Sequence, residues 1–141
     1  MSTFADTSAV VKLYVDEPGH DVVRPLGPLV VSRLVRVEVV AALWAIQRRG
    51  RLCARAAATL VSAFEADYTT PGSVYAVVEP VPAVLDDAAG LAGTHGLRAY
   101  DAVQLASARA AAAADDRVRT FAAFDGALRD AAAREGFVLV P

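Results

Sequence analysis

The sequence predicts an α/β fold in which helices cover a parallel β-sheet. Short apolar segments alternate along the chain with longer segments whose apolar residues recur at helical spacing. The order of a strand followed by a helix opens the chain and repeats from residue 29 onward. Such alternation is typical of parallel sheets, because a crossover helix separates each strand from the next parallel strand.

Turn and cap residues indicate where the helices begin and end. The helix over residues 7–14 ends before Pro18 and Gly19, and Gly50 closes the long helix that begins at residue 34. Pro82 suits the first position of a helix. In chain order, the predicted elements are a strand at 2–5, a helix at 7–14, a strand at 29–31, helices at 34–49 and 54–66, a strand at 75–78, helices at 82–92 and 101–114, a strand at 118–123, a helix at 126–134 and a strand at 137–140.

Length and composition predict one soluble domain spanning residues 1–141. The chain has no internal repeat and no linker-like segment, and no apolar run approaches the roughly 20 residues that span a membrane. Cys53 is the only cysteine, which favours a reducing, cytoplasmic compartment. A hydrophobic fraction of 55% is high for this size and favours an oligomer. The net charge of −2 argues against binding of nucleic acid through the overall field, although local arginine clusters can still bind it.

Acidic residues follow the predicted strands at the edge where parallel α/β sheets bind ligands. Asp6 comes directly after the first strand, Asp125 follows the fourth, and Glu38 lies in the helix after the second. Asp101 begins the alanine-rich helix, which follows a helix and a loop and not a strand. These acids are therefore expected to share one site.

Glu38 has the strongest physical case among these acids. Its helical neighbours three and four positions away are leucine, valine and alanine, none of which can pair with a carboxylate. Carboxylates forced together repel one another unless a divalent cation neutralises them, and hard oxygen ligands suit Mg²⁺ or Mn²⁺. Zinc is not expected, because there is no cysteine pair and His20 and His95 lie apart in predicted loops.

Structural roles remain open for the same residues. Asp6, Asp101 and Asp125 could each be an ordinary helix N-cap, and Glu38 could face solvent if its helix is rotated. Among the basic residues Arg48, Arg49, Arg51 and Arg55, a solvated helix end is favoured over phosphate binding. Leu43, Trp44 and Ile46 are favoured as core residues over a groove for a partner helix.

Four segments of the chain resemble the successive motifs of PIN-domain nucleases. They are Ala5-Asp6-Thr7-Ser8-Ala9, Ser32-Arg33-Leu34 with Glu38 six residues after the serine, residues 97–106 with the sequence Leu-Arg-Ala-Tyr-Asp-Ala-Val-Gln-Leu-Ala, and Phe124-Asp125. The resemblance runs the whole length, and within the family the chain is most similar to the VapC-type ribonuclease toxins of VapBC toxin-antitoxin modules.

The resemblance implies a three-layer α/β/α domain that binds Mg²⁺ or Mn²⁺ and hydrolyses RNA as an endoribonuclease. Its acidic residues correspond to Asp6, Glu38, Asp101 and Asp125, which would bind the metal and act as the catalytic set. Thr7 or Ser8 would support them from a second shell, although helix capping is at least as good an explanation for each. The resemblance also implies that a small antitoxin protein inhibits the enzyme by packing on the predicted helices at 34–49 and 54–66. It implies a homodimer as well.

Two positions depart from the family pattern. Relatives often carry Thr or Ser where this chain has Ala123, so the side chain of this residue cannot donate a hydrogen bond near Asp125. Relatives also often have His where Gln104 stands. The alternative that remains open is a non-catalytic PIN-fold module that binds RNA or protein.

Other enzyme classes fail on particular residues. A phosphatase of the haloacid-dehalogenase type needs a second Asp where Ser8 stands, and a receiver domain needs a lysine near the end of the chain, whereas Lys12 is the only lysine. No GxSxG, GxxxxGKS or GxGxxG motif is present.

Overall fold

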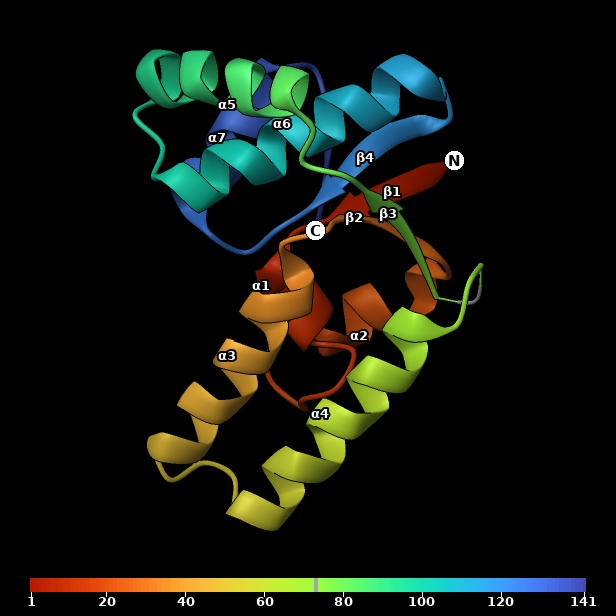
Figure 1. Ribbon diagram of the computed structural model, residues 1–141, viewed down its shortest axis with the longest axis vertical. Helices are drawn as coiled ribbons and strands as arrows, with labels where there is room; N and C mark the ends of the chain where they lie inside the picture. The colour runs from red at the N-terminus through yellow and green to blue at the C-terminus, as the bar shows by residue number, and fades with distance from the viewer. Residues whose placement is uncertain (73) are drawn as a thin grey trace.

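The computed structural model describes residues 1–72 and 74–141 and shows a parallel β-sheet between two layers of helices (Figure 1). Its strands are β1 (Ser2–Ala5), β2 (Leu29–Ser32), β3 (Tyr75–Val78), β4 (Val118–Ala122) and β5 (Val138–Val140). They lie in the order β3-β2-β1-β4-β5, and every neighbouring pair is parallel. The predicted α/β/α fold with a central parallel sheet is therefore confirmed.

The helices divide between the two faces of this sheet (Figure 1). One layer contains α1 (Thr7–Val11), α2 (His20–Val23), the 3-10 turn Arg24–Leu26, α3 (Val35–Arg48) and α4 (Ala54–Thr69); the other contains α5 (Pro82–His95), α6 (Ala99–Ala114) and α7 (Gly126–Arg134). None of the described helices is long and apolar enough to cross a membrane.

Alternation along the strands gives each layer its own core. Phe4 packs with α5, α6 and α7, whereas the next residue, Ala5, packs with α1 and α3 on the opposite face. Phe121 and Ala122 of β4 repeat this division, and the rings of Phe4 and Phe121 stack with centroids 5.3 Å apart. Both faces of the sheet are thus buried, as expected for parallel strands.

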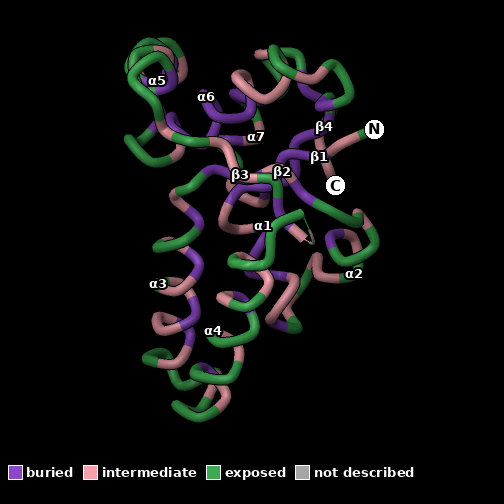
Figure 2. Tube along the Cα trace, turned by 45° about the vertical axis from the view of Figure 1, so that its right-hand side comes forward, coloured by how far each residue is buried: buried purple, intermediate pink, exposed green. Residues whose placement is uncertain are grey.

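Helices α3 and α4 lie side by side and extend away from the sheet (Figure 1). Their facing residues include Leu43, Ile46 and Phe64, all buried, whereas the far ends of the two helices are exposed (Figure 2). Leu43 and Ile46 are therefore core residues, while Trp44 is only half-buried.

Several predicted boundaries are wrong by a few residues. The first helix ends at Val11 instead of continuing to residue 14, because the chain turns toward the Pro18-Gly19 segment. The alanine-rich helix begins at Ala99, two residues earlier than predicted, because the extended backbone of Arg98 marks its N-cap. The short helix α2 is not predicted. His20 begins this helix, and α5 extends three residues beyond its predicted end to His95. Neither histidine therefore lies in a loop, contrary to the prediction.

Candidate active site

All four predicted acids line one groove of about 920 Å³. The sheet order explains how three of them meet. From β1 the chain progresses to β2 and β3 on one side, and later to β4 and β5 on the other, so the connections diverge between β1 and β4. Asp6 follows β1 and Asp125 follows β4, so both lie at this switch point, and Glu38 reaches it from the first turn of α3.

Asp6 is the most buried of the four, with 5% of its surface exposed. Its Oδ1 accepts hydrogen bonds from the backbone N–H of Ala9 at 3.0 Å and from the hydroxyl of Ser8 at 2.7 Å. The pKa of Asp6 is raised to about 6: burial raises it most, these two hydrogen bonds lower it, and the charges of Asp101 and Glu38 also raise it. Asp6 therefore caps α1 and also bears the repulsion of its acidic neighbours.

Glu38 is bridged to two other elements of the fold. Its Oε1 accepts hydrogen bonds from Thr7 Oγ1 of α1 at 3.0 Å and from Gln104 Nε2 of α6 at 2.9 Å. Gln104 also donates to Thr7 Oγ1 at 3.2 Å, while its own Oε1 is buried without a partner among the described residues. Glu38 thus joins the helices of the two layers. It is half-buried and lines the groove, so α3 is not rotated in a way that leaves this side chain on the outer surface.

Asp101 and Asp125 occupy two different positions in their helices. Asp101 is the third residue of α6 and not its N-cap, so the start of α6 brings it to the same groove. Burial raises its pKa, the charge of Asp125 adds to this effect, and Arg98, 3.8 Å away, opposes it. Asp125 caps α7 by accepting a hydrogen bond from Leu128 N at 3.1 Å.

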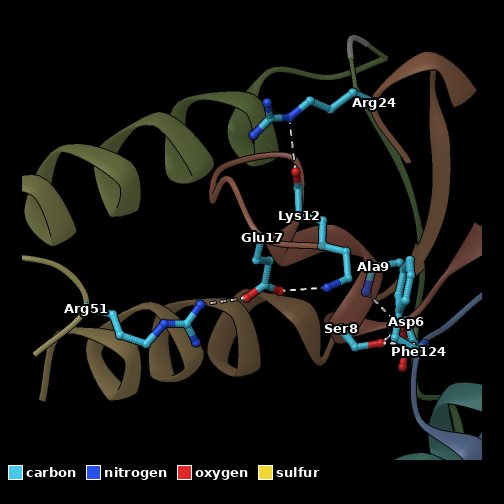
Figure 3. Close-up of polar contacts among 8 residues, drawn as sticks. All are labelled: Asp6, Ser8, Ala9, Lys12, Glu17, Arg24, Arg51 and Phe124. Carbon is cyan, nitrogen blue, oxygen red and sulfur yellow. Dashed lines mark hydrogen bonds and ion pairs between the residues drawn. The ribbon is translucent and has the colours of Figure 1, made fainter. Parts of the chain in front are cut away.

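Ser8 links Asp6 to the segment that carries Asp125. The backbone N–H of Phe124 donates to Ser8 Oγ at 3.0 Å, and the same hydroxyl donates to Asp6 (Figure 3). The residue before Phe124 is Ala123, whose carbonyl oxygen accepts a hydrogen bond from Arg129 at 2.8 Å. Contacts from Ser8 and Arg129 therefore hold this segment, although Ala123 offers no hydroxyl.

Lys12 and Glu17 hold the other side of Phe124. The Lys12 ammonium lies 2.8 Å from Glu17 Oε1 and 4.3 Å from the centroid of the Phe124 ring (Figure 3). Glu17 also approaches Arg51 at 3.7 Å, so this ion pair reaches the far end of the groove. Arg48, Arg49, Arg51 and Arg55 are all exposed, and of these Arg49 and Arg51 line the groove.

The donor chemistry of the four acids fits a hard divalent cation. In the described part of the chain, no basic side chain forms an ion pair with Asp6, Glu38 or Asp125, and Asp101 has only its distant contact with Arg98. A buried carboxylate with acidic neighbours and no cationic partner is stabilised by a cation with oxygen ligands, such as Mg²⁺ or Mn²⁺. The side chains do not themselves form a coordination shell: among residues 1–72 and 74–141, no group of three His, Cys, Asp or Glu is arranged to hold a metal ion.

Thr7 and Ser8, the two second-shell residues that the sequence predicts, contact Glu38 and Asp6. The sequence does not predict the third supporting residue, Gln104, whose amide reaches Glu38 across 66 positions of sequence. Phe124 and Lys12 likewise meet only in the folded chain. Helical spacing cannot reveal such contacts, because the partners lie on different elements.

Comparison with known proteins identifies the family. The family described as "PIN domain" matches residues 3–134. The crystal structure of PAE2754 from Pyrobaculum aerophilum is similar in fold, with a TM-score of 0.61 and 23% identity over 99% of this chain and 90% of that one. Comparison with curated proteins finds no significant match. Because the family match spans nearly all of a chain whose sheet and helical layers agree with it, this protein belongs to the PIN domain family.

Proposed function

We propose that this protein is an endoribonuclease that depends on Mg²⁺ or Mn²⁺. PIN domains are typically metal-dependent nucleases, and membership of the family gives this activity its prior support. The observation that carries the proposal is the convergence of Asp6, Glu38, Asp101 and Asp125 on one groove, with Asp6 buried among them. Clustered carboxylates repel one another and reduce the stability of the fold. Clusters of this kind are typical of functional sites.

In this proposal the four carboxylates hold the cation, and neighbouring groups orient them. A bound divalent cation supplies Lewis-acid chemistry that activates water and offsets charge on the phosphate. Ser8 holds Asp6, and Thr7 together with Gln104 holds Glu38, so the oxygen ligands face the groove in fixed directions. Hydrolysis by water leaves a 5′-phosphate and a 3′-hydroxyl without a covalent intermediate.

The finer proposal is that the protein acts in the cytoplasm as the toxin of a type II toxin-antitoxin system. The groove continues from the acids along α3 past the apolar Ala41, Ala45 and Ile46 to Arg49. A small antitoxin with an amphipathic segment fits such a surface. The same apolar surface also supports the proposal that the protein forms a homodimer. The lone, exposed Cys53 suits a reducing compartment.

One observation favours a different function, that of a non-catalytic PIN-fold module that binds RNA or protein. Asp6 and Asp125 both cap helices and Glu38 has two donors, so these three acids already have structural partners. On this alternative the acids stabilise helix ends and bind no metal.

Cleavage of RNA by the purified, partner-free protein tests the proposal. Structured RNA is incubated with Mg²⁺, with Mn²⁺ and with EDTA, using the wild type, Asp6→Asn and a control, Asp130→Asn, at an exposed position of α7. We expect cleavage only with metal, by the wild type and the control. Cleavage that survives EDTA, or that Asp6→Asn retains in full, would sink the nuclease proposal and favour the binding module.

The toxin assignment has a separate test. Expression of the chain should arrest growth, and co-expression of a short reading frame encoded immediately upstream should relieve the arrest. An active nuclease without such a partner would be a solitary ribonuclease.

A further inference from the structure

An exposed aromatic ring borders the four acids. Tyr100 lines the same groove and is 63% exposed, directly before Asp101 in the first turn of α6. Gln104, whose amide contacts Glu38, lies four positions later and thus on the same face of α6. Tyr100 therefore lies about one helical turn from Gln104 along α6.

Tyr100 differs from the other tyrosines of the chain. Tyr14 and Tyr75 share a hydrogen bond, and Tyr68 accepts one from Arg33. All three also have aromatic neighbours. In the described part of the chain, Tyr100 has no hydrogen-bond partner and no ring contact, so packing within the fold does not explain an aromatic residue at this position.

Two other residues that line the groove, one charged and one apolar, match the chemistry of a nucleotide. The side chain of Arg98 is 87% exposed, and its closest carboxylate is Asp101 at 3.8 Å, which leaves the guanidinium accessible to a phosphate. From α3, Val37 lines the groove and is 70% exposed. An aromatic ring and a guanidinium that line one groove are the combination by which proteins bind unpaired bases and their phosphates.

We infer that Tyr100 is a stacking platform for one unpaired base of single-stranded RNA beside the acidic site, with Arg98 contacting an adjoining phosphate. The inference rests on the proposed RNA substrate and deepens it by assigning a base-binding residue beside the acids. A base inside a duplex already stacks on both faces and cannot lie against the ring.

Binding of a short, fluorescently labelled oligoribonucleotide, measured by anisotropy in Ca²⁺, tests this role without relying on cleavage. The proteins compared are the wild type, Tyr100→Ala, Tyr100→Phe and a control, Leu85→Ala, at an exposed apolar position of α5 outside the groove. Stacking predicts that Tyr100→Ala weakens binding by roughly 5- to 150-fold. Tyr100→Phe, which keeps the ring, and Leu85→Ala should bind as the wild type does.

A scan with abasic nucleotides identifies the stacked base. At one position of the strand, removal of the base should weaken binding to the wild type as much as Tyr100→Ala does. The same removal should cause no further loss in Tyr100→Ala, because the two changes delete one contact.

Three results would overturn the inference. Tyr100→Ala could bind single strands as tightly as the wild type. If this variant then bound a protein inhibitor more weakly, Tyr100 would belong to a protein interface and not to an RNA site. Tyr100→Phe could lose as much affinity as Tyr100→Ala, which would indicate a hydroxyl contact. Blunt duplex RNA could show the same dependence on Tyr100. If the protein cleaves RNA but Tyr100→Ala binds it as the wild type does, only the stacking role of Tyr100 is rejected. If binding depends on Tyr100 but no metal-dependent cleavage occurs, only the proposed nuclease activity is rejected.

Discussion

Asp6 combines a structural and a proposed chemical role in a single side chain. Its Oδ1 caps α1 through Ala9 N, and its burial beside Asp101 and Glu38 raises its pKa to about 6. Capping stabilises the helix whether or not a metal binds, whereas the charge is unfavourable without a cation. The two roles can be separated, because asparagine caps a helix as well as aspartate does but carries no charge.

Without metal, Asp6→Asn should therefore make the protein more stable at pH 7. A carboxyl whose pKa is raised from 3.8 to about 6 binds more protons in the folded state, so stability falls as the pH rises from about 4 to about 6. A shift of this size corresponds to roughly 2–3 kcal/mol at pH 7. Thermal unfolding in EDTA should show a wild type that is more stable at pH 5 than at pH 7, with a smaller difference in Asp6→Asn.

The exposed Asp130 provides the control, since Asp130→Asn should leave the pH dependence unchanged. If Asp6→Asn unfolds at or below the wild-type temperature at pH 7 in EDTA, the charge of Asp6 is not a source of instability.

Gln104 should affect activity far more than stability. Gln104→Met removes the donor to Glu38, but it also removes the Gln104 Oε1, which is buried without a partner among the described residues. These two effects on unfolding oppose each other, each at about 1–3 kcal/mol. Metal affinity or cleavage should fall by roughly 10- to 100-fold, as for loss of other groups that orient metal ligands.

Parallel measurement of thermal unfolding and cleavage rate checks this separation for Gln104→Met. A variant that is strongly destabilised, or one that cleaves RNA at the wild-type rate, would show that Gln104 does not orient Glu38.

At the scale of elements, the segment between β4 and α7 is held against the α1–α2 connection. Gly19 has a φ of +99°, and a Cβ there would lie 2.5 Å from Phe124 Cε1. Phe124 immediately precedes Asp125 and donates its N–H to Ser8. Packing at Gly19 therefore bears on the position of an acid that lies on a different element.

Gly19→Ala should destabilise the fold by about 1–3 kcal/mol through overpacking, in addition to the backbone strain. Gly136→Ala is the matched control, because Gly136 has a similar φ of +92° with nothing within 4 Å of the added Cβ. Urea unfolding of both variants should show the larger loss for Gly19→Ala, accompanied by lower cleavage activity. Equal losses would mean that the contact with Phe124 contributes nothing.

The order of elements could be predicted from the sequence because strands and helices differ in local pattern. Residues 75–78 and 126–134 form their elements within the predicted bounds. Helix ends were less accurate, since the end of α1 at Val11 depends on how the chain turns toward Phe124. The edge reached by Asp101 depends on how α5 and α6 pack, which no local pattern contains.

At the scale of the whole molecule, the groove joins the two helical layers. Asp6 and Glu38 come from the layer of α1 and α3, whereas Asp101 comes from the layer of α5 and α6. The bridge from Gln104 to Glu38 and Thr7 crosses between them. The candidate site therefore depends on the packing of both layers against one sheet. Asp6 and Asp125 could be predicted from strand ends, whereas the contact of Gln104 with Glu38 could not, because it joins the two layers.

Binding of Mn²⁺, followed by calorimetry, tests most directly whether the four acids form a metal site. The wild type should bind Mn²⁺ at pH 7 and release protons. Because the proton on Asp6, with a pKa of about 6, competes with the metal, binding should weaken by about ten-fold at pH 5. Asp6→Asn and Asp101→Asn should bind much more weakly at both pH values. A wild type that binds no Mn²⁺, or variants that bind it as tightly as the wild type, would contradict the account.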